Sequence, residues 1–171
     1  GADKAVRINA TPTDAITVAQ NIKNHISANA YDLIICGQES IDYNGQQVPA
    51  MVAALMNYPF VNACVGLELD GSTAKTKAEI DGGHATYSNA LPMVIGGKKG
   101  LVEEKDLRIP NMRGIMSARS KPLAVEDAAG GDAPTKAVSF EKPAAKAAVK
   151  MVDADNVEEL VRLLNEEAKA I

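Results

Sequence analysis

The chain has 171 residues, of which 46% are hydrophobic, and its 18 basic and 22 acidic side chains give a formal net charge of −4. This length suits one folded domain with an appendage, and the apolar content argues against a disordered chain. The charge gives no electrostatic reason to bind nucleic acid or an anionic membrane, and no apolar run approaches the ~20 residues that stable membrane insertion requires.

The two cysteines, Cys36 and Cys64, each lie inside an apolar run. Buried free thiols of a cytoplasmic protein are therefore favoured over a disulfide or a metal pair. The histidines, His25 and His84, complete no zinc spacing with them, so we expect a cytoplasmic protein without a metal centre.

A strand and a helix are predicted first. Residues 5–8 read as a short strand, and Thr11 and Pro12 then supply an N-cap and a proline at the first helical position. The helix is predicted over residues 12–28, with His25 at a polar boundary and not a ligand. Its inward side carries apolar residues at helical spacing: Ile16, Ala19, Ile22 and Ile26.

A second strand and helix follow. The apolar run 33–36 is short and β-branched, which predicts a strand buried on both faces of a parallel sheet. The next helix is predicted over residues 46–56 and ends before Pro59. Its apolar face consists of Val48, Val52, Leu55 and Met56. Alternating strands and helices predict an α/β fold with a parallel sheet.

The loop between this second strand and helix is a candidate anion site. It lies at the carboxyl end of a strand and before a helix amino terminus, where free N–H groups and the helix dipole favour an anion. Side chains able to hydrogen-bond a ribose or phosphate are Asp42, Asn44, Gln46 and Gln47. They can equally be turn residues and caps, and the loop has no lysine or arginine to neutralise a phosphate.

Strands without intervening helices come next. They are predicted at residues 61–69, 73–80, 84–88 and 91–95. Turn signals separate them, which indicates an antiparallel excursion that returns to the main sheet. His84 is predicted to occupy an exposed sheet position. The glycine-rich run 96–100 lacks the spacing of a P-loop and is predicted to be a flexible turn, and the run 42–45 does not fit a calcium loop.

The carboxyl-terminal part carries two short helices. Residues 111–121 form a basic helix with Met112, Ile115 and Met116, which either docks on the sheet or reaches a partner through Met112. The composition from residue 127 is that of a linker. The last predicted helix places Val157, Leu160, Val161 and Leu164 on one face, and a partner subunit is a good candidate to cover it.

Three stretches together resemble the beta subunit of electron-transfer flavoprotein. They are residues 31–42, the hairpin segment 79–83 followed by 91–94, and the segment 108–122. The resemblance implies part of a parallel-sheet nucleotide-binding domain of the adenine-nucleotide-hydrolase type, with an antiparallel hairpin excursion and a carboxyl-terminal extension. It divides the chain into a domain (1–126), a linker or extended arm (127–152) and a tail helix that packs on a partner (153–171). Because family members open with roughly eighty more residues, the chain resembles their carboxyl-terminal portion.

The resemblance also implies cofactors. It places the phosphate of AMP, or a second FAD in electron-bifurcating relatives, in the loop that follows Gly37. The cofactor-binding residues it implies are Gly37, Asp42, Asn44, Gly45, Gln46, Gln47 and Val48. Gly45 stands where threonine or cysteine is common and Pro49 where glycine is common, so a loop hydroxyl is missing. The main FAD is expected in the alpha subunit.

The implied partners are that alpha subunit, in a heterodimer, and acyl-CoA dehydrogenases of fatty acid oxidation. Met112 aligns with a residue that anchors partner dehydrogenases, Arg113 lies beside it, and Glu79 aligns with an acidic residue that meets the mobile FAD domain. The sequence offers no catalytic constellation, so an electron carrier is expected and not an enzyme. The alternatives are a stand-alone adenine-nucleotide-binding module of the universal-stress type and an inert truncated fragment.

Overall fold

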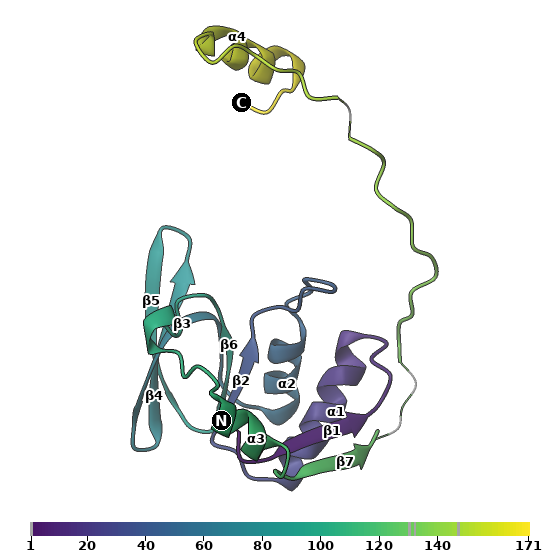
Figure 1. The fold of residues 1–171 in the computed structure, drawn as a ribbon, viewed down its shortest axis with the longest axis vertical. Helices are drawn as coiled ribbons and strands as arrows, with labels where there is room; N and C mark the ends of the chain where they lie inside the picture. Colours follow the sequence, from purple (N-terminus) through teal and green to yellow (C-terminus); the bar gives the residue numbers. More distant parts are fainter. Residues whose placement is uncertain (1, 130, 132, 147) are drawn as a thin grey trace. The chain divides into compact units, whose positions relative to one another are not determined.

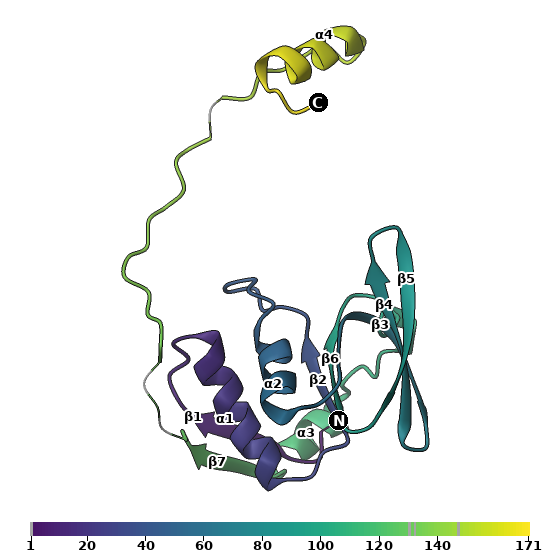
Figure 2. The same ribbon diagram turned by 180° about the vertical axis from the view of Figure 1, so that it is seen from behind.

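The computed structural model describes residues 2–129, 131, 133–146 and 148–171 (Figures 1 and 2). The chain divides into two units, Gly1–Lys136 and Ala137–Ile171. Within the described residues, the first unit contains the seven strands and three α-helices.

The first unit contains two sheets. Strands β1 (Ala5–Asn9) and β7 (Leu123–Asp127) form a two-stranded parallel sheet. The other sheet has five strands in the order β2-β6-β3-β4-β5. Its strands are β2 (Leu33–Gly37), β3 (Phe60–Asp70), β4 (Thr73–Ile80), β5 (Gly83–Ala90) and β6 (Met93–Gly97). β2, β6 and β3 run parallel, whereas β3, β4 and β5 are antiparallel, so the α/β class and the antiparallel excursion are confirmed.

Helices α1 (Ala15–Ala28) and α2 (Val48–Met56) pack against each other and cover one face of the β2–β6 region. The cluster between helices and sheet contains Ala19, Ile26, Val52, Ala53 and Val94. Its burial removes apolar surface from water, which is the main force that fixes both helices on the sheet. The predicted inward stripe of α1 is confirmed at Ala19 and Ile26. The prediction for α2 is wrong at Leu55, which is 37% exposed, because Pro49 and Ala53 occupy the buried side instead.

The opposite face of the five-stranded sheet carries a second cluster. Its buried members are Val61, Cys64, Ala74, Ala78, Met93 and Ile95. β2 is an edge strand, and Ile35 on it is 60% exposed. The prediction that this strand is buried on both faces is therefore wrong. Its short apolar run looks the same in sequence whether the strand is central or at an edge.

Two boundary predictions need correction. Helix α1 begins at Ala15, and its N-cap is Asp14, whose Oδ1 accepts the Thr17 N–H at 2.9 Å. Thr11 and Pro12 lie before the helix, because a carboxylate three residues before a free N–H makes the better cap. In the glycine run, Gly96 and Gly97 belong to β6. Gly96 has no room for a Cβ, because the Asn62 side chain lies directly against it.

His25 joins α1 to the two-stranded sheet. Its Nδ1–H donates to the Glu126 carboxylate at 2.9 Å, and its Nε2 lies 2.8 Å from the Tyr31 hydroxyl. The His25 side chain is only 15% exposed, which confirms a boundary position. His84 is exposed on β5, as predicted. Both cysteines are free: Cys64 is buried and Cys36 is half-buried, and burial raises the pKa of the Cys36 thiol.

Two further segments of the first unit are a 3-10 turn (Glu104–Asp106) and helix α3 (Met112–Ala118). In the second unit, α4 (Val157–Arg162) continues as a wider turn (Leu163–Glu167). The expected apolar face there is exposed at Val157, Leu160 and Val161, and the buried residue is Leu163, which the sequence analysis did not single out. Among the described residues, no helix is both long and apolar enough to cross a bilayer.

Candidate functional site

The loop from β2 to α2 begins beside the carboxyl end of β6. The Gln38 N–H donates to the Gly97 carbonyl at 2.9 Å, which continues the parallel pairing of the two strands by one bond. A turn follows, in which the Asn44 N–H donates to the Ser40 carbonyl at 2.8 Å. The loop is thus anchored at the strand end, where ligands of open α/β sheets bind.

The middle of the loop is shaped by backbone conformation and amide contacts. Asn44 and Gln46 have φ values of 47° and 52°, a left-handed conformation that Asn tolerates better than most residues. The Gln46 side chain donates to Glu39 at 3.1 Å and accepts from the Gln38 side chain at 3.3 Å. Gln46 therefore already has partners within the loop. No crowding requires Gly45, because a Cβ there would meet nothing within 4 Å.

Helix α2 begins without a side-chain cap. Its N-cap residue is Gln47, which makes no capping hydrogen bond, and Pro49 lies in the first turn. The first N–H groups of a helix lack intrahelical partners, and the helix dipole adds partial positive charge there. The amino terminus of α2 thus presents backbone donors beside the loop, as a phosphate site requires.

The side-chain charges of the loop oppose this backbone field. Glu39 and Asp42 are acidic, and the loop contains no lysine or arginine. A hydrogen bond from the Ser40 hydroxyl holds the pKa of the Asp42 carboxyl below its ordinary value. The loop thus offers backbone N–H groups and amide side chains to an anion, but it supplies no cation to balance the anion's charge.

The structure keeps the predicted cofactor-binding residues together as one continuous loop from Gly37 to Val48. Asp42, Asn44, Gly45 and Gln47 are exposed, and Val48 is half-buried at the start of α2. Within the described residues, no cluster of three or more His, Cys, Asp or Glu side chains could hold a metal ion.

Asn62 is a residue of this region that the sequence analysis missed. It lies on β3 in a bulge where Ala63 has a φ of 49°, and its side chain packs on Gly96 near the end of β6. Its Oδ1 atom is buried and has no hydrogen-bond partner. The available signal was a carboxamide inside the apolar run 61–69, which is rare unless the amide has a partner.

The predicted partner-binding residues lie on two surfaces. Asn111 caps α3 by accepting the Gly114 N–H at 2.8 Å, which fixes the start of the helix. Met112, Ile115 and Met116 are all exposed, Met112 by 72%, and Arg113 is exposed beside them. The sequence alternative in which α3 docks its apolar side on the sheet is therefore wrong. Glu79 accepts a hydrogen bond from Lys98 at 2.8 Å, and this contact holds the pKa of the Glu79 carboxyl below its ordinary value.

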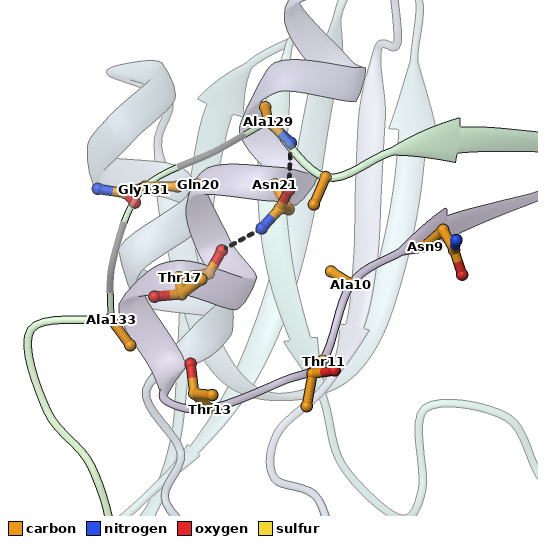
Figure 3. A pocket seen from close by; sticks show the side chains of 11 residues that line it. Asn9, Ala10, Thr11, Thr13, Thr17, Gln20, Asn21, Ala129, Gly131 and Ala133 are labelled. Atoms are coloured by element: carbon orange, nitrogen blue, oxygen red, sulfur yellow. Dashed lines mark hydrogen bonds between the residues drawn. The ribbon is translucent and has the colours of Figure 1, made fainter.

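A second region was not expected from the sequence. A pocket of about 360 Å³ lies at the carboxyl ends of β1 and β7, beside the first turns of α1 (Figure 3). Its chemistry differs from that of the loop, and it is considered separately below.

Comparison with known proteins gives one family. A model of the electron transfer flavoprotein domain matches residues 1–130. The chain is 33% identical to the electron transfer flavoprotein subunit beta of Syntrophomonas wolfei, over 92% of this chain and 62% of that subunit. It is 31% identical to the Bacillus subtilis subunit beta over 100% of this chain and 71% of that protein, and 33% identical to the Bradyrhizobium diazoefficiens subunit beta over 98% and 68%. The chain thus spans about two thirds of the length of these relatives.

Proposed function

The chain belongs to the electron transfer flavoprotein family, and we propose that it serves as a beta-type subunit of a heterodimeric electron carrier. In this proposal an alpha subunit holds FAD, which supplies the redox chemistry, and acyl-CoA dehydrogenases donate the electrons. This chain contributes a nucleotide site and docking surfaces and performs no catalysis of its own.

The observation that carries the proposal is the uncapped amino terminus of α2, which faces the loop at the carboxyl end of β2. We propose that backbone N–H groups there, with Asn44 and Gln47, hold the phosphate of AMP or of a second FAD. Gly37 ends β2 and lets the chain leave the sheet, and Gln46 braces the loop through Glu39 and Gln38. Asp42 carries a negative charge, which favours a monoanionic phosphate or one balanced by a group from another subunit.

Titration calorimetry of the 171-residue chain tests this site. AMP should bind with one-to-one stoichiometry, and adenosine, which lacks the phosphate, should bind at the loop at least about tenfold more weakly, because charge-assisted hydrogen bonds are the strong ones. Absence of AMP binding would contradict the nucleotide site. Tight binding of ATP by a chain that forms no complex with an alpha subunit would favour the universal-stress alternative.

The exposed side of α3 is the proposed dehydrogenase contact. Its methionines are flexible apolar side chains that can fill a partner's pocket, and Arg113 adds a positive charge beside them. Glu79, paired with Lys98, is proposed to meet the FAD domain of the alpha subunit by exchanging that exposed ion pair for one across the interface. The exposed apolar residues of α4 are proposed to pack on the alpha subunit as well.

The docking proposal is tested in the complex with an alpha subunit. Met112→Ala should slow electron transfer from an acyl-CoA dehydrogenase about tenfold or more and leave flavin content and assembly intact, because a hot-spot side chain contributes about 2 kcal/mol. Leu123→Ala, an exposed apolar truncation on β7, is the matched control and should leave the rate unchanged. If Met112→Ala prevents assembly, Met112 belongs to the subunit interface and the proposal fails.

A further inference from the structure

The pocket beside α1 is built from uncharged hydrogen-bonding side chains. Its polar lining comes from the end of β1, the segment after it and the first three turns of α1: Asn9, Thr11, Thr13, Thr17, Gln20 and Asn21. Small residues that follow β7, alanines and one glycine, form the other wall. The pocket thus lies at the carboxyl ends of two paired parallel strands, the position where open α/β sheets bind ligands.

Asn21 holds the two walls of the pocket together. Its Nδ2 donates to the Thr17 carbonyl at 2.9 Å, and its Oδ1 accepts the Ala129 N–H at 3.0 Å (Figure 3). Asn21 is only 9% exposed, so these bonds are shielded from water. The wall after β7 is therefore fixed to α1 by a buried side chain and does not merely pass over it.

The Thr17 hydroxyl is a polar group of this pocket without a partner. Its Oγ1 is buried and makes no hydrogen bond in the described structure. The Asp14 carboxylate lies near this hydroxyl, and the Thr17 side chain helps to lower the pKa of that carboxyl. A buried hydroxyl without a partner is costly. Because the Thr17 Oγ1 has almost no accessible surface, a ligand hydroxyl would satisfy it only after the Thr17 side chain turns toward the pocket.

The electrostatics of the pocket select against anions. Among the described residues that line it, none carries a charge. The amino terminus of α1, which would otherwise attract an anion, is occupied by the Asp14 carboxylate, which accepts from the Thr17 N–H, the Thr135 N–H and the Thr135 hydroxyl. A phosphate would meet this negative charge and no cation, whereas a neutral ligand would meet only hydroxyl and amide groups.

We propose that this pocket binds the hydroxyl groups of a neutral sugar, either a free pentose or the ribose of a nucleoside. Its volume of about 360 Å³ lies at the lower end of the range for small-molecule sites, which suits a ligand of one or two rings. Hydroxyls that both donate and accept match the mixed lining of threonine hydroxyls and asparagine and glutamine amides. The assignment is independent of the β2–α2 loop and of the electron-carrier proposal.

Backbone amide NMR of the full chain, titrated separately with D-ribose, adenosine and inorganic phosphate, tests the assignment. D-ribose or adenosine should cause saturable shifts at Thr17, Gln20, Asn21 and Ala129. Similar affinities for the two ligands would show that the sugar alone is sufficient for binding. At least tenfold tighter binding of adenosine would show that the ligand is a nucleoside. Phosphate should leave these amides unchanged, whatever it does at residues 40–48, so the pocket and the loop are judged separately.

Two substitutions at Thr17 sharpen the test. Thr17→Val removes a hydroxyl that has no protein partner, so the chain should fold, and sugar affinity should fall about threefold to tenfold. Thr17→Ser keeps the hydroxyl and should keep the affinity, and Thr86→Val on exposed β5 is the matched control. The assignment is overturned if neither sugar shifts these amides at about 10 mM, if phosphate shifts them as strongly, or if Thr17→Val binds like the unchanged chain.

Discussion

The molecule contains two connections from a parallel strand to a helix, β1–α1 and β2–α2, and it treats the two helix amino termini in opposite ways. The α1 terminus is closed by Asp14, which also holds Thr135. The α2 terminus starts at Gln47 with no side-chain cap. Equal topology therefore produces one terminus already satisfied by a carboxylate and one still able to accept an anion.

This difference shows that the fold alone does not determine which kind of ligand each helix terminus can bind. Both connections place a loop at the carboxyl end of a strand, so topology alone would predict an anion site at each. The side chain at the N-cap decides which one keeps its positive field. The closed terminus borders a pocket of uncharged groups, and the open terminus borders the loop from Gly37 to Val48.

The largest expected effect tests whether the same hydrophobic cluster holds both connections in place. Ile26 of α1 is 6% exposed and belongs to the cluster that also contains Val52 of α2. Ile26→Ala should lower the unfolding free energy of the first unit by about 2–5 kcal/mol, because it leaves a cavity where both helices meet. Denaturant titration measures the loss. Native-state hydrogen exchange should show both connections losing protection together.

Ile80→Ala is the matched control for this change. Ile80 is exposed at the end of β4, so its truncation should cost under about 0.5 kcal/mol. If Ile26→Ala loosens the β1–α1 connection and leaves β2–α2 protected, the two regions fold as separate units and the shared cluster is not their common support.

The fold could be predicted from the sequence where its signals are local. Turns were predicted on both sides of residues 73–80, and the structure has them there, with positive φ values at Gly71 and Gly82. The bounds of β4 follow from the alternation between these turns. Burial was harder to predict. Whether the run 33–36 lies inside the sheet or at its edge depends on which strands pair with it, and its own residues do not contain that information.

The two candidate sites differ in the same way, because one could be recognised from local sequence and the other could not. The loop at 37–48 is continuous in sequence, so its glycine, its amides and the helix behind it could be recognised without the structure. The pocket joins the stretch from Asn9 to Asn21 to a wall that follows β7, and Ala129 of that wall lies 108 positions after Asn21. Its one sequence signal was the pair Thr17 and Asn21, polar residues four apart on an amphipathic helix. Such pairs are as common on solvent-exposed helix faces.

A carboxylate added at the α2 amino terminus should make that terminus resemble the capped terminus of α1. Gln47→Asp supplies α2 with the carboxylate cap that α1 has, which should stabilise the helix by about 1 kcal/mol. The same carboxylate should weaken AMP binding about tenfold or more, because it competes for the N–H groups and repels the phosphate. Calorimetry measures both changes, with Asn24→Asp at an exposed position of α1 as the control for added charge. Unchanged AMP affinity would show that the phosphate is not held at α2.

The smallest expected effect is the acid dependence of the closed terminus. The Thr17 backbone N–H, with help from Thr135, holds the pKa of the Asp14 carboxyl below its ordinary value of 3.8. A depressed folded-state pKa contributes stability that is present above the unfolded value and is lost as the pH falls through the folded value. The denaturation midpoint of the unchanged chain should therefore fall below about pH 4, and Asp14→Asn should flatten this part of the profile. Asp70→Asn, at the exposed end of β3, is the matched control and should leave the profile as it is. Because Asp14 is only partly buried, the difference should be small. Its absence would mean that Thr17 and Thr135 do not hold the carboxylate in solution, so that the α1 terminus would be as open to anions as that of α2.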